Sequence, residues 1–289
     1  MNYHISSETG DDANPGTWTE PWRTLARASA HHYQSEDWIM LREGESFPGT
    51  LILSAENVTE GEYPILIKSY HDFGAAKPVI EAGDGDGIQI RNVGNVFIRD
   101  VDVCGSGYAT NTGWGVCVVN DAPGARRLSK VNIHTVNATG FRWAGIYVGG
   151  VPNDLPGVIA PDECRYGFSD ISITYCTANA NMYYGIYVSG PLRPDMTDYA
   201  NENVAIIESK AHGNHGDKHY TANHSGSGIL LDNCRNGRIE RCEAYDNGAE
   251  NAGQTGGPCG IWSHASDRIV IRYCKSYENR TGGAADGTG

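Results

Sequence analysis

The chain has 289 residues, of which 20% are charged, and its net charge at pH 7 is −13. A strongly acidic chain repels phosphate backbones, so the composition predicts no nucleic-acid partner. The same field disfavours a polyanionic glycan unless a cation or a local basic cluster intervenes. No stretch approaches the roughly 18 consecutive apolar residues that cross a bilayer, so we expect no membrane span.

Residues 1–36 predict a strand followed by a short helix. The opening "MNYHIS" has a strand pattern, "NPG" at 14–16 predicts a turn, and residues 21–33 have a helical pattern. No signal peptide is visible in this stretch. Two interpretations stay open from these residues: a cytosolic protein, or a protein whose leader has been removed.

From residue 87 onward the chain repeats a two-part unit. A glycine followed by alternating apolar residues opens each unit, and a second strand pattern follows after a gap of variable length. The six glycine strands are "GIQIR" at 87–91, "GVCVV" at 115–119, "GIYVG" at 145–149, "GIYVS" at 185–189, "GILLD" at 228–232 and "GIWSH" at 260–264. The six second patterns begin at residues 96, 131, 171, 204, 238 and 269.

The second patterns align column by column. One column holds small or apolar residues, including Cys176, Cys242 and Cys274, and the column two residues later is mostly alanine. A period of two predicts that both columns face inward. Four asparagines follow in register, and identical side chains at strand spacing can bond along the stack. They are Asn181, Asn214, Asn247 and Asn279.

These units contain no helix long enough for a βαβ crossover, and an antiparallel sandwich would not keep its columns in register. Stacking them makes one continuous core. The pattern therefore predicts an all-β fold, a single-stranded right-handed parallel β-helix (a solenoid). The variable gaps become loops, which are where binding and catalysis usually occur. Those before the glycine strands include 179–184, 212–227 and 245–259, and those after them include 149–169 and 189–203.

The repeats at 87–276, with the entry segment at 3–28, resemble the pectin-lyase-like right-handed β-helix superfamily. The resemblance implies a short N-terminal helix that caps the coil, so we expect one domain, with strand and cap at 1–36 and the β-helix at 37–289. The polygalacturonase and mannuronan epimerase motifs are absent. The chain ends where a seventh glycine strand should begin, so we expect it to be part of a longer helix that could hold further active-site residues.

The outward positions of the glycine strands carry aromatic residues. Tyr147, Tyr187 and Trp262 lie in one column, and Trp114, Trp143 and Tyr184 lie on the same rim. Sugar rings pack on aromatic faces, so the row is a candidate substrate-binding groove. The alternative is that the long loops fold over this face and take the aromatic residues as their own core.

Histidines gather in the loop at 212–228. His215, Asp217 and His224 are catalytic candidates there, because acid–base chemistry on a sugar needs carboxylates or groups with tuned pKa values. A metal site and a solvated polar loop are the alternatives. Asp232 and His264 occupy equivalent positions on adjacent coils and form a further acid–base candidate, the alternative being a surface hydrogen bond.

Asp84 and Asp86, ahead of the first glycine strand, are similar to ligands of calcium-binding pectate lyases and are the candidate metal site. No cofactor is otherwise required, and a turn of this composition needs no ion. The inward cysteines are expected to be free, unreactive thiols.

The first functional hypothesis is a polysaccharide-active enzyme, a lyase or a glycoside hydrolase, that binds a glycan chain along an outer face. The alternative is a non-catalytic carbohydrate-binding or structural β-helix. The partner in either case is a polysaccharide or oligosaccharide. Because members of the superfamily are mostly extracellular, the resemblance implies a secreted or periplasmic protein.

Overall fold

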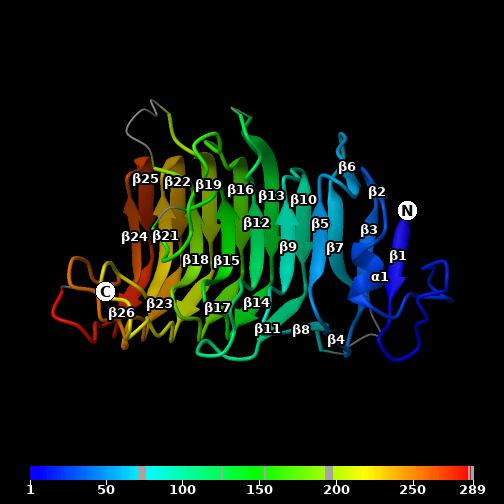
Figure 1. Cartoon of the computed structure of the whole chain (residues 1–289), viewed down its shortest axis with the longest axis horizontal. Coiled ribbons are helices and arrows are strands. Elements are labelled where there is room, and N and C mark those ends of the chain that lie inside the picture. Colours follow the sequence, from blue (N-terminus) through cyan, green and yellow to red (C-terminus); the bar gives the residue numbers. More distant parts are fainter. Residues whose placement is uncertain (71–75, 125, 153, 193–197, 286, 288–289) are drawn as a thin grey trace.

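The structure is a computed structural model that describes residues 1–289 except 71–75, 125, 153, 193–197, 286 and 288–289. Its strands stack into three long sheets, in which every pair of neighbours for which a register is given runs parallel (Figure 1). Successive strands of the chain visit the sheets in turn, so each circuit of the chain is one coil. The expected right-handed parallel β-helix is confirmed.

The glycine strands form the seven-stranded sheet: β5 (Leu51–Ser54), β9 (Ile88–Arg91), β12 (Val116–Val119), β15 (Ala144–Gly149), β18 (Tyr184–Ser189), β21 (Ser227–Asp232) and β24 (Ile261–His264). The nine-stranded sheet holds β1 (Asn2–Ile5), β3 (Trp38–Arg42), β7 (Ile65–Tyr70), β10 (Val96–Arg99), β13 (Leu128–His134), β16 (Phe168–Thr174), β19 (Asn201–Ile207), β22 (Cys234–Glu240) and β25 (Asp267–Arg272). The eight-stranded sheet holds β4 (Ser46–Pro48), β8 (Val79–Gly83), β11 (Asp102–Gly105), β14 (Asn137–Thr139), β17 (Thr177–Asn179), β20 (Lys210–His212), β23 (Glu243–Tyr245) and β26 (Lys275–Tyr277). A two-stranded sheet pairs β2 (Tyr33–Gln34) with β6 (Val58–Thr59).

Each coil has three strands where the sequence predicts two. The second pattern of each unit is split between the nine-stranded and eight-stranded sheets by one residue in the left-handed region. In the coil of β10 and β11 that residue is Asp100, with φ of 55°. The sequence did not predict this bend, because the residues at its column are Asp, Thr, Tyr, Glu and Arg. Glycine and asparagine, which such a conformation favours, do not occur there. The equivalent residues are Thr135, Tyr175, Glu208, Arg241 and Tyr273.

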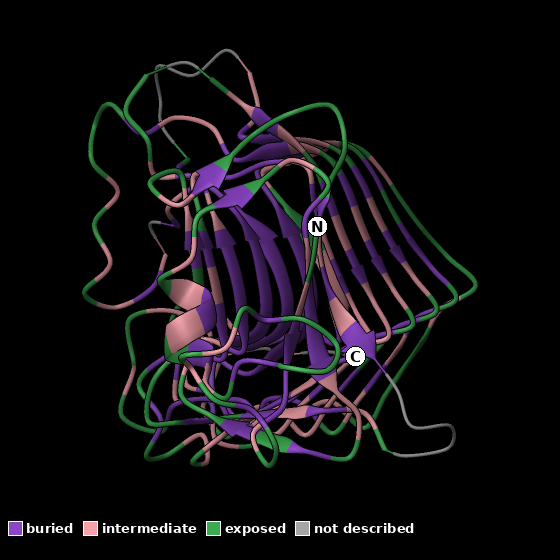
Figure 2. Cartoon of the chain, turned by 90° about the vertical axis from the view of Figure 1, so that its right-hand side faces the viewer, coloured by how far each residue is buried: buried purple, intermediate pink, exposed green. Residues whose placement is uncertain are grey.

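The interior of the coil is apolar along its length, and Figure 2 shows the buried strands enclosing it, seen from the end that carries β1. The aligned inward columns are buried as predicted, Cys176 and Ala178 among them, except in the last coil, where Cys274 is partly exposed and Ser276 is exposed. The glycine that opens each unit is explained by the same packing. A Cβ on Gly185 would lie 2.7 Å from the Ala211 Cβ, so no side chain fits at this corner. The last coil leaves this inner face open, and Ile271 is 43% exposed there.

The asparagine stack is confirmed as a hydrogen-bonded ladder. Asn181 Nδ2 donates to Asn214 Oδ1 at 3.0 Å, and Asn214 Nδ2 donates to Asn247 Oδ1 at 2.8 Å. Asn247 Nδ2 continues the series to Asn279 Oδ1 at 2.7 Å. Three of these side chains are fully buried, so the ladder satisfies polar groups that water cannot reach at the corner between two sheets.

The N-terminal helix α1 (Leu25–Ser29) is shorter than the predicted 21–33. Thr24 caps it by accepting a hydrogen bond from the Arg27 amide. The helix packs beside β5, the edge of the seven-stranded sheet, and Ser29 Oγ accepts the Ile52 amide at 2.9 Å. It thus satisfies a donor that an open edge would leave unpaired. Among the described residues, no helix is long and apolar enough to cross a membrane.

Candidate active site

A second apolar cluster lies outside the coil, over the outer face of the seven-stranded sheet. This outer aromatic cluster is built around Tyr147, Tyr183, Tyr184, Tyr187, Leu155 and Leu230, with Trp114, Trp143, Trp262 and Tyr220 packed against it. Tyr147 and Tyr187 are 0% exposed and Tyr184 is 1% exposed. The expectation of an open groove floor is therefore wrong for these three tyrosines, because the loops cover them, as the alternative interpretation held.

A cavity of about 390 Å³ opens beside this cluster. Strands β21 and β24 supply its floor, and described residues of the loops 149–169, 189–203, 212–227 and 245–259 supply its walls. Its lining includes Asp154, His224, Leu230, Asp232, Trp262 and His264. Asn223, Thr255, Gly256, Gly257, Cys259 and Leu192 complete the lining. Four of the predicted site residues thus meet in one place: Asp232, His264, His224 and Trp262.

Asp232 is held by hydrogen bonds on both of its carboxylate oxygens. Ser189 Oγ, from the adjacent strand β18, donates to Asp232 Oδ2 at 2.9 Å. His264 Nδ1, one coil further on, lies 2.9 Å from Asp232 Oδ1. This bond raises the pKa of His264 above its usual value, and the Asp232 charge adds to the effect. The predicted neighbourhood of Asp232 and His264 is therefore present, and it lies at the cavity.

A second carboxyl group reaches the cavity from the loop after β15. Tyr184 Oη donates to Asp154 Oδ2 at 2.6 Å, and Tyr187 Oη donates to Asp154 Oδ1 at 2.8 Å. Burial raises the pKa of Asp154; the hydroxyl bonds lower it, the charge of Asp232 raises it further, and the balance is upward. The two carboxyl groups of the cavity therefore lie in different environments.

His224 and Trp262 form one wall of the cavity. Their rings meet edge to face, with centroids 4.9 Å apart. Burial lowers the pKa of His224 to about 4, so this imidazole is uncharged at neutral pH. Trp262 is partly exposed and offers an apolar ring to the cavity, next to Leu230. Of the six predicted aromatic residues, Trp262 alone lines this cavity in the described part of the chain.

The other candidates of the histidine loop lie elsewhere. The His215 ring stacks on Tyr108 with centroids 3.9 Å apart, and His215 Nδ1 lies 3.9 Å from Glu250 Oε1. Asp217 Oδ2 accepts the Tyr183 hydroxyl at 2.8 Å and faces Arg142 at 3.6 Å. Trp114 and Trp143 are partly buried against the outer aromatic cluster. None of these four residues lines the cavity.

Asp84 and Asp86 bind different parts of the next loop. Asp84 Oδ1 accepts the Ser106 hydroxyl at 2.6 Å, whereas Asp86 Oδ1 accepts the Trp114 amide at 2.8 Å. Among the described residues, no group of three His, Cys, Asp or Glu side chains is arranged to hold a metal ion. The calcium site stays a prediction. Among the described residues no cysteine forms a disulfide bond, and burial raises the pKa of Cys176 and of Cys242 to about 12.

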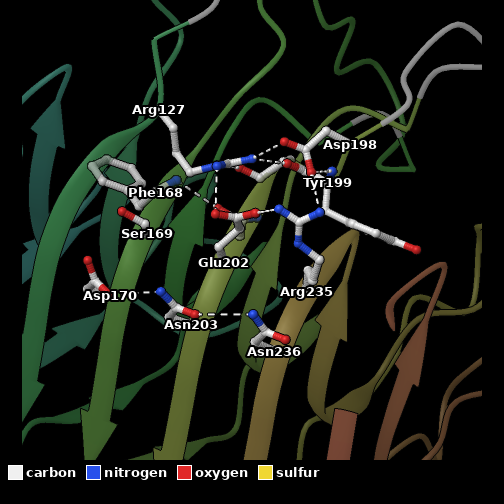
Figure 3. Close-up of polar contacts among 12 residues, drawn as sticks. Arg127, Phe168, Ser169, Asp170, Asp198, Tyr199, Glu202, Asn203, Arg235 and Asn236 are labelled. Atoms are coloured by element: carbon white, nitrogen blue, oxygen red, sulfur yellow. Dashed lines mark hydrogen bonds and ion pairs between the residues drawn. The ribbon is translucent and has the colours of Figure 1, made fainter. Parts of the chain in front are cut away.

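An ion-pair cluster that the sequence did not suggest fixes the far end of the loop 189–203 (Figure 3). Arg127 binds Glu202 at 2.8 Å and Asp198 at 3.1 Å, and Arg235 binds the same two carboxylates from the next coil. The cluster lies on the outside of the nine-stranded sheet, where it spans the coils from β13 to β22, and none of its residues lines the cavity.

Residues 123–285, more than half of the chain, match the family model described as "Right handed beta helix region". The chain belongs to this family. A stretch of 101 residues is 33% identical to the lacto-N-biosidase of Bifidobacterium longum subsp. longum, over 32% of this chain and 6% of that protein. The chain thus spans a small part of that curated relative.

Two solved structures similar to this chain are of a GH136 lacto-N-biosidase from Eubacterium ramulus. The selenomethionine derivative has a TM-score of 0.68 and 15% identity over 96% of this chain and 52% of that one. The native form has a TM-score of 0.57 and 16% identity over 94% and 55%. A rhamnogalacturonan lyase has a TM-score of 0.54 and 16% identity over 97% and 69%. These likenesses show the fold.

Sequence reasoning missed Asp154. The loop 149–169 is expected to be a place for function, but the catalytic candidates come from the loop 212–228 and from the glycine strands. A survey of the carboxylates in the long loops would have included Asp154 together with Asp162 and Glu163. Nothing in the local pattern separates these three carboxylates, because the choice depends on which one the folded loop brings to the cavity that Asp232 lines.

Proposed function

We propose that the cavity is the active site of a glycoside hydrolase that acts on a carbohydrate chain. In this proposal Asp154 is the general acid and Asp232 is the nucleophile, or the base that activates water. The observation that carries the proposal is that two carboxyl groups line one cavity in different environments. Glycosidases separate the roles of two carboxyl groups in this way. The 33% identity of one segment to a lacto-N-biosidase supports the class of reaction.

The expected chemistry follows from each environment. A raised pKa keeps a proton on Asp154 at a higher pH than an exposed aspartate would hold it, so Asp154 can protonate the oxygen of the leaving sugar. Asp232, oriented by Ser189 and His264, keeps its carboxylate available to the positive charge that develops at the anomeric carbon. Trp262 supplies an apolar face on which a sugar ring can pack.

The lining favours hydrolysis over elimination. A lyase that acts on a uronate must neutralise the sugar carboxylate, usually with a cation. Among the described residues that line the cavity none is Lys or Arg, and the chain as a whole carries a charge of −13. An uncharged sugar is therefore a better partner for this cavity than a uronic acid.

The test uses the whole chain with a panel of neutral and acidic oligosaccharides, with products identified by mass spectrometry. We expect products of hydrolysis from neutral substrates, and no ultraviolet absorbance from an unsaturated uronate. Asp154→Asn and Asp232→Asn should each lower turnover by about 100-fold or more. Asp217→Asn, which changes a buried carboxylate outside the cavity, is the matched control.

Binding of a glycan without any product would overturn the hydrolase in favour of a binding protein. An unsaturated product would overturn it in favour of a lyase. Equal losses in all three variants would show that buried aspartates matter for folding and would remove the assignment of Asp154 and Asp232. With hydrolysis established, the anomeric configuration of the first product, read by NMR, distinguishes a nucleophile from a base at Asp232.

A further inference from the structure

We propose that Tyr184 and Tyr187 are positioning residues, which hold the loop-borne carboxyl group of Asp154 over the cavity in the orientation that proton transfer requires. The inference rests on the proposed function, because it concerns the residue assigned there as the acid. It gives a role to Tyr187 of the second "GIYV" strand and to Tyr184 just before that strand, and the coil itself requires neither tyrosine.

The geometry joins two different kinds of structure. Tyr184 and Tyr187 belong to β18, in the middle of the seven-stranded sheet, and their side chains point away from the coil interior into the outer aromatic cluster. Their rings stack with centroids 4.0 Å apart and 20° between the planes. Asp154 belongs to the connection between β15 and β16, whose described residues form no strand of their own. The rigid sheet therefore reaches the loop through two hydroxyl groups.

Both oxygens of Asp154 are engaged, each by a different tyrosine. Two donors on two oxygens fix the plane of the carboxyl group as well as its distance, whereas one donor would leave it free to rotate. Leu155, the next residue, is 4% exposed within the outer aromatic cluster and anchors the backbone beside it. The outer aromatic cluster thus both orients the carboxyl group of Asp154 and anchors the backbone next to it.

The hydroxyl groups also affect the charge of Asp154. Hydrogen bonds to a carboxylate favour its ionised form, and here they oppose the burial that raises the pKa of Asp154. Among the described residues, Asp232 from β21, His264 from β24, Tyr147 from β15 and Tyr220 from the loop 212–227 also interact with Asp154, and His224 lines the same cavity. Because those groups stay in place, removing one tyrosine hydroxyl should raise the pKa of Asp154 further.

Tyr184→Phe and Tyr187→Phe keep the stacked rings and remove one bond each. Tyr183→Phe is the matched control, since Tyr183 lies in the same buried cluster but its hydroxyl donates to Asp217. In the first two variants the alkaline limb of the pH profile of kcat/KM should move upward by roughly half to one pH unit. We expect kcat to fall by about tenfold with little change in KM, and the control should keep the wild-type profile.

A second readout does not depend on activity. With aspartate labelled at the carboxyl carbon, NMR titration follows Asp154 directly, and the spectrum of Asp154→Asn assigns its signal. The pKa of Asp154 should rise in Tyr184→Phe and in Tyr187→Phe, and should be unchanged in Tyr183→Phe. Equal titration in the wild type and all three variants would overturn the inference. If the pKa of Asp154 rises in the two variants but the protein hydrolyses no substrate, the positioning of Asp154 by the tyrosines would be supported and the proposed function would be removed.

Discussion

The protein has two cores, one inside the coil and one outside it, and they differ in how many of their buried side chains need a hydrogen-bond partner. The core inside the coil is built mainly from aliphatic residues, alanine and cysteine, with a few aromatic rings such as Phe141 and Phe168, and the asparagine ladder at its corner is hydrogen-bonded within itself. The outer aromatic cluster is built largely from tyrosines, each with a hydroxyl group that needs a partner once it is buried. Those partners are specific: Asp217 for Tyr183, Asp154 for Tyr184 and Tyr187, and main-chain oxygens for Tyr147.

This difference separates stability from function. The inner core tolerates substitution by other apolar residues of similar size at the inward positions, because those side chains need only to be buried. The outer cluster connects packing to particular carboxyl groups, and two of its tyrosines bind Asp154, which lines the cavity. The seven-stranded sheet is the wall between them, so neighbouring residues of one strand, Ile186 and Tyr187, serve opposite cores.

Ile186→Ala should show the largest effect on stability. Ile186 is fully buried in the inner core, and removing three carbon atoms there costs about 2–5 kcal/mol in the free energy of unfolding. Urea denaturation of the whole chain measures the loss. A cost no greater than that of Tyr187→Phe would contradict the division into a stability core and a site-supporting cluster.

Asn214→Ala tests the polar part of the inner structure. Asn214 Oδ1 accepts from both the main-chain amide and Nδ2 of Asn181, so the alanine leaves buried donors unpaired. We expect a loss of about 1–3 kcal/mol in the free energy of unfolding. Asn279→Ala is the control at the open end of the ladder, where Asn279 is only partly buried, and it should cost less. Because Asn279 accepts the same two bonds from Asn247, equal losses would mean that partial exposure at the open end does not reduce the cost of breaking the ladder.

Leu155→Ala repeats the large-to-small change in the outer aromatic cluster. Leu155 is on a loop, so the loop can detach locally without unfolding the coil. The global free energy of unfolding should fall by less than about half of the loss in Ile186→Ala. Limited proteolysis should nevertheless cut the loop 149–169 faster than in the wild type. A global loss as large as that of Ile186→Ala would show that the two cores unfold as one.

Substitutions of His224 and His264 should have the smallest effects on stability, and the two should change its pH dependence in opposite directions. The pKa of His264 is raised in the folded protein, so its contribution is present below about pH 6.5 and is lost as the pH rises through the folded value. The pKa of His224 is lowered to about 4, so stability is lost as the pH falls from about 6.5 towards 4. His264→Gln should therefore remove stability mainly at low pH, and His224→Gln should flatten the loss on acidification. Free energies of unfolding measured from pH 4 to 8 check both predictions. If both variants changed the pH dependence of stability in the same direction, the opposite pKa shifts of the two histidines would be contradicted.

The sequence by itself determined the coil. Glycine strands, small inward columns and stacked asparagines repeat in register, and each is a local response to the same stacking of one coil on the next. Positions such as Cys176 and Asn214 could therefore be predicted, and so could the meeting of Asp232 with His264, because equivalent columns on adjacent coils must be neighbours. The third strand of each coil escaped prediction, since the residue at its bend carries no distinctive side chain.

Only the tertiary structure decided the rest of the site. The choice between a groove and a loop core for Tyr147, Tyr184 and Tyr187 depended on where the long loops lie, and loops have no periodicity from which to read a position. Asp154 joins Asp232 through such a loop, and His215 and Asp217 are directed away from the cavity by another. Repetition specifies the contacts between coils, whereas contacts between a loop and a coil depend on the path of a segment that occurs once.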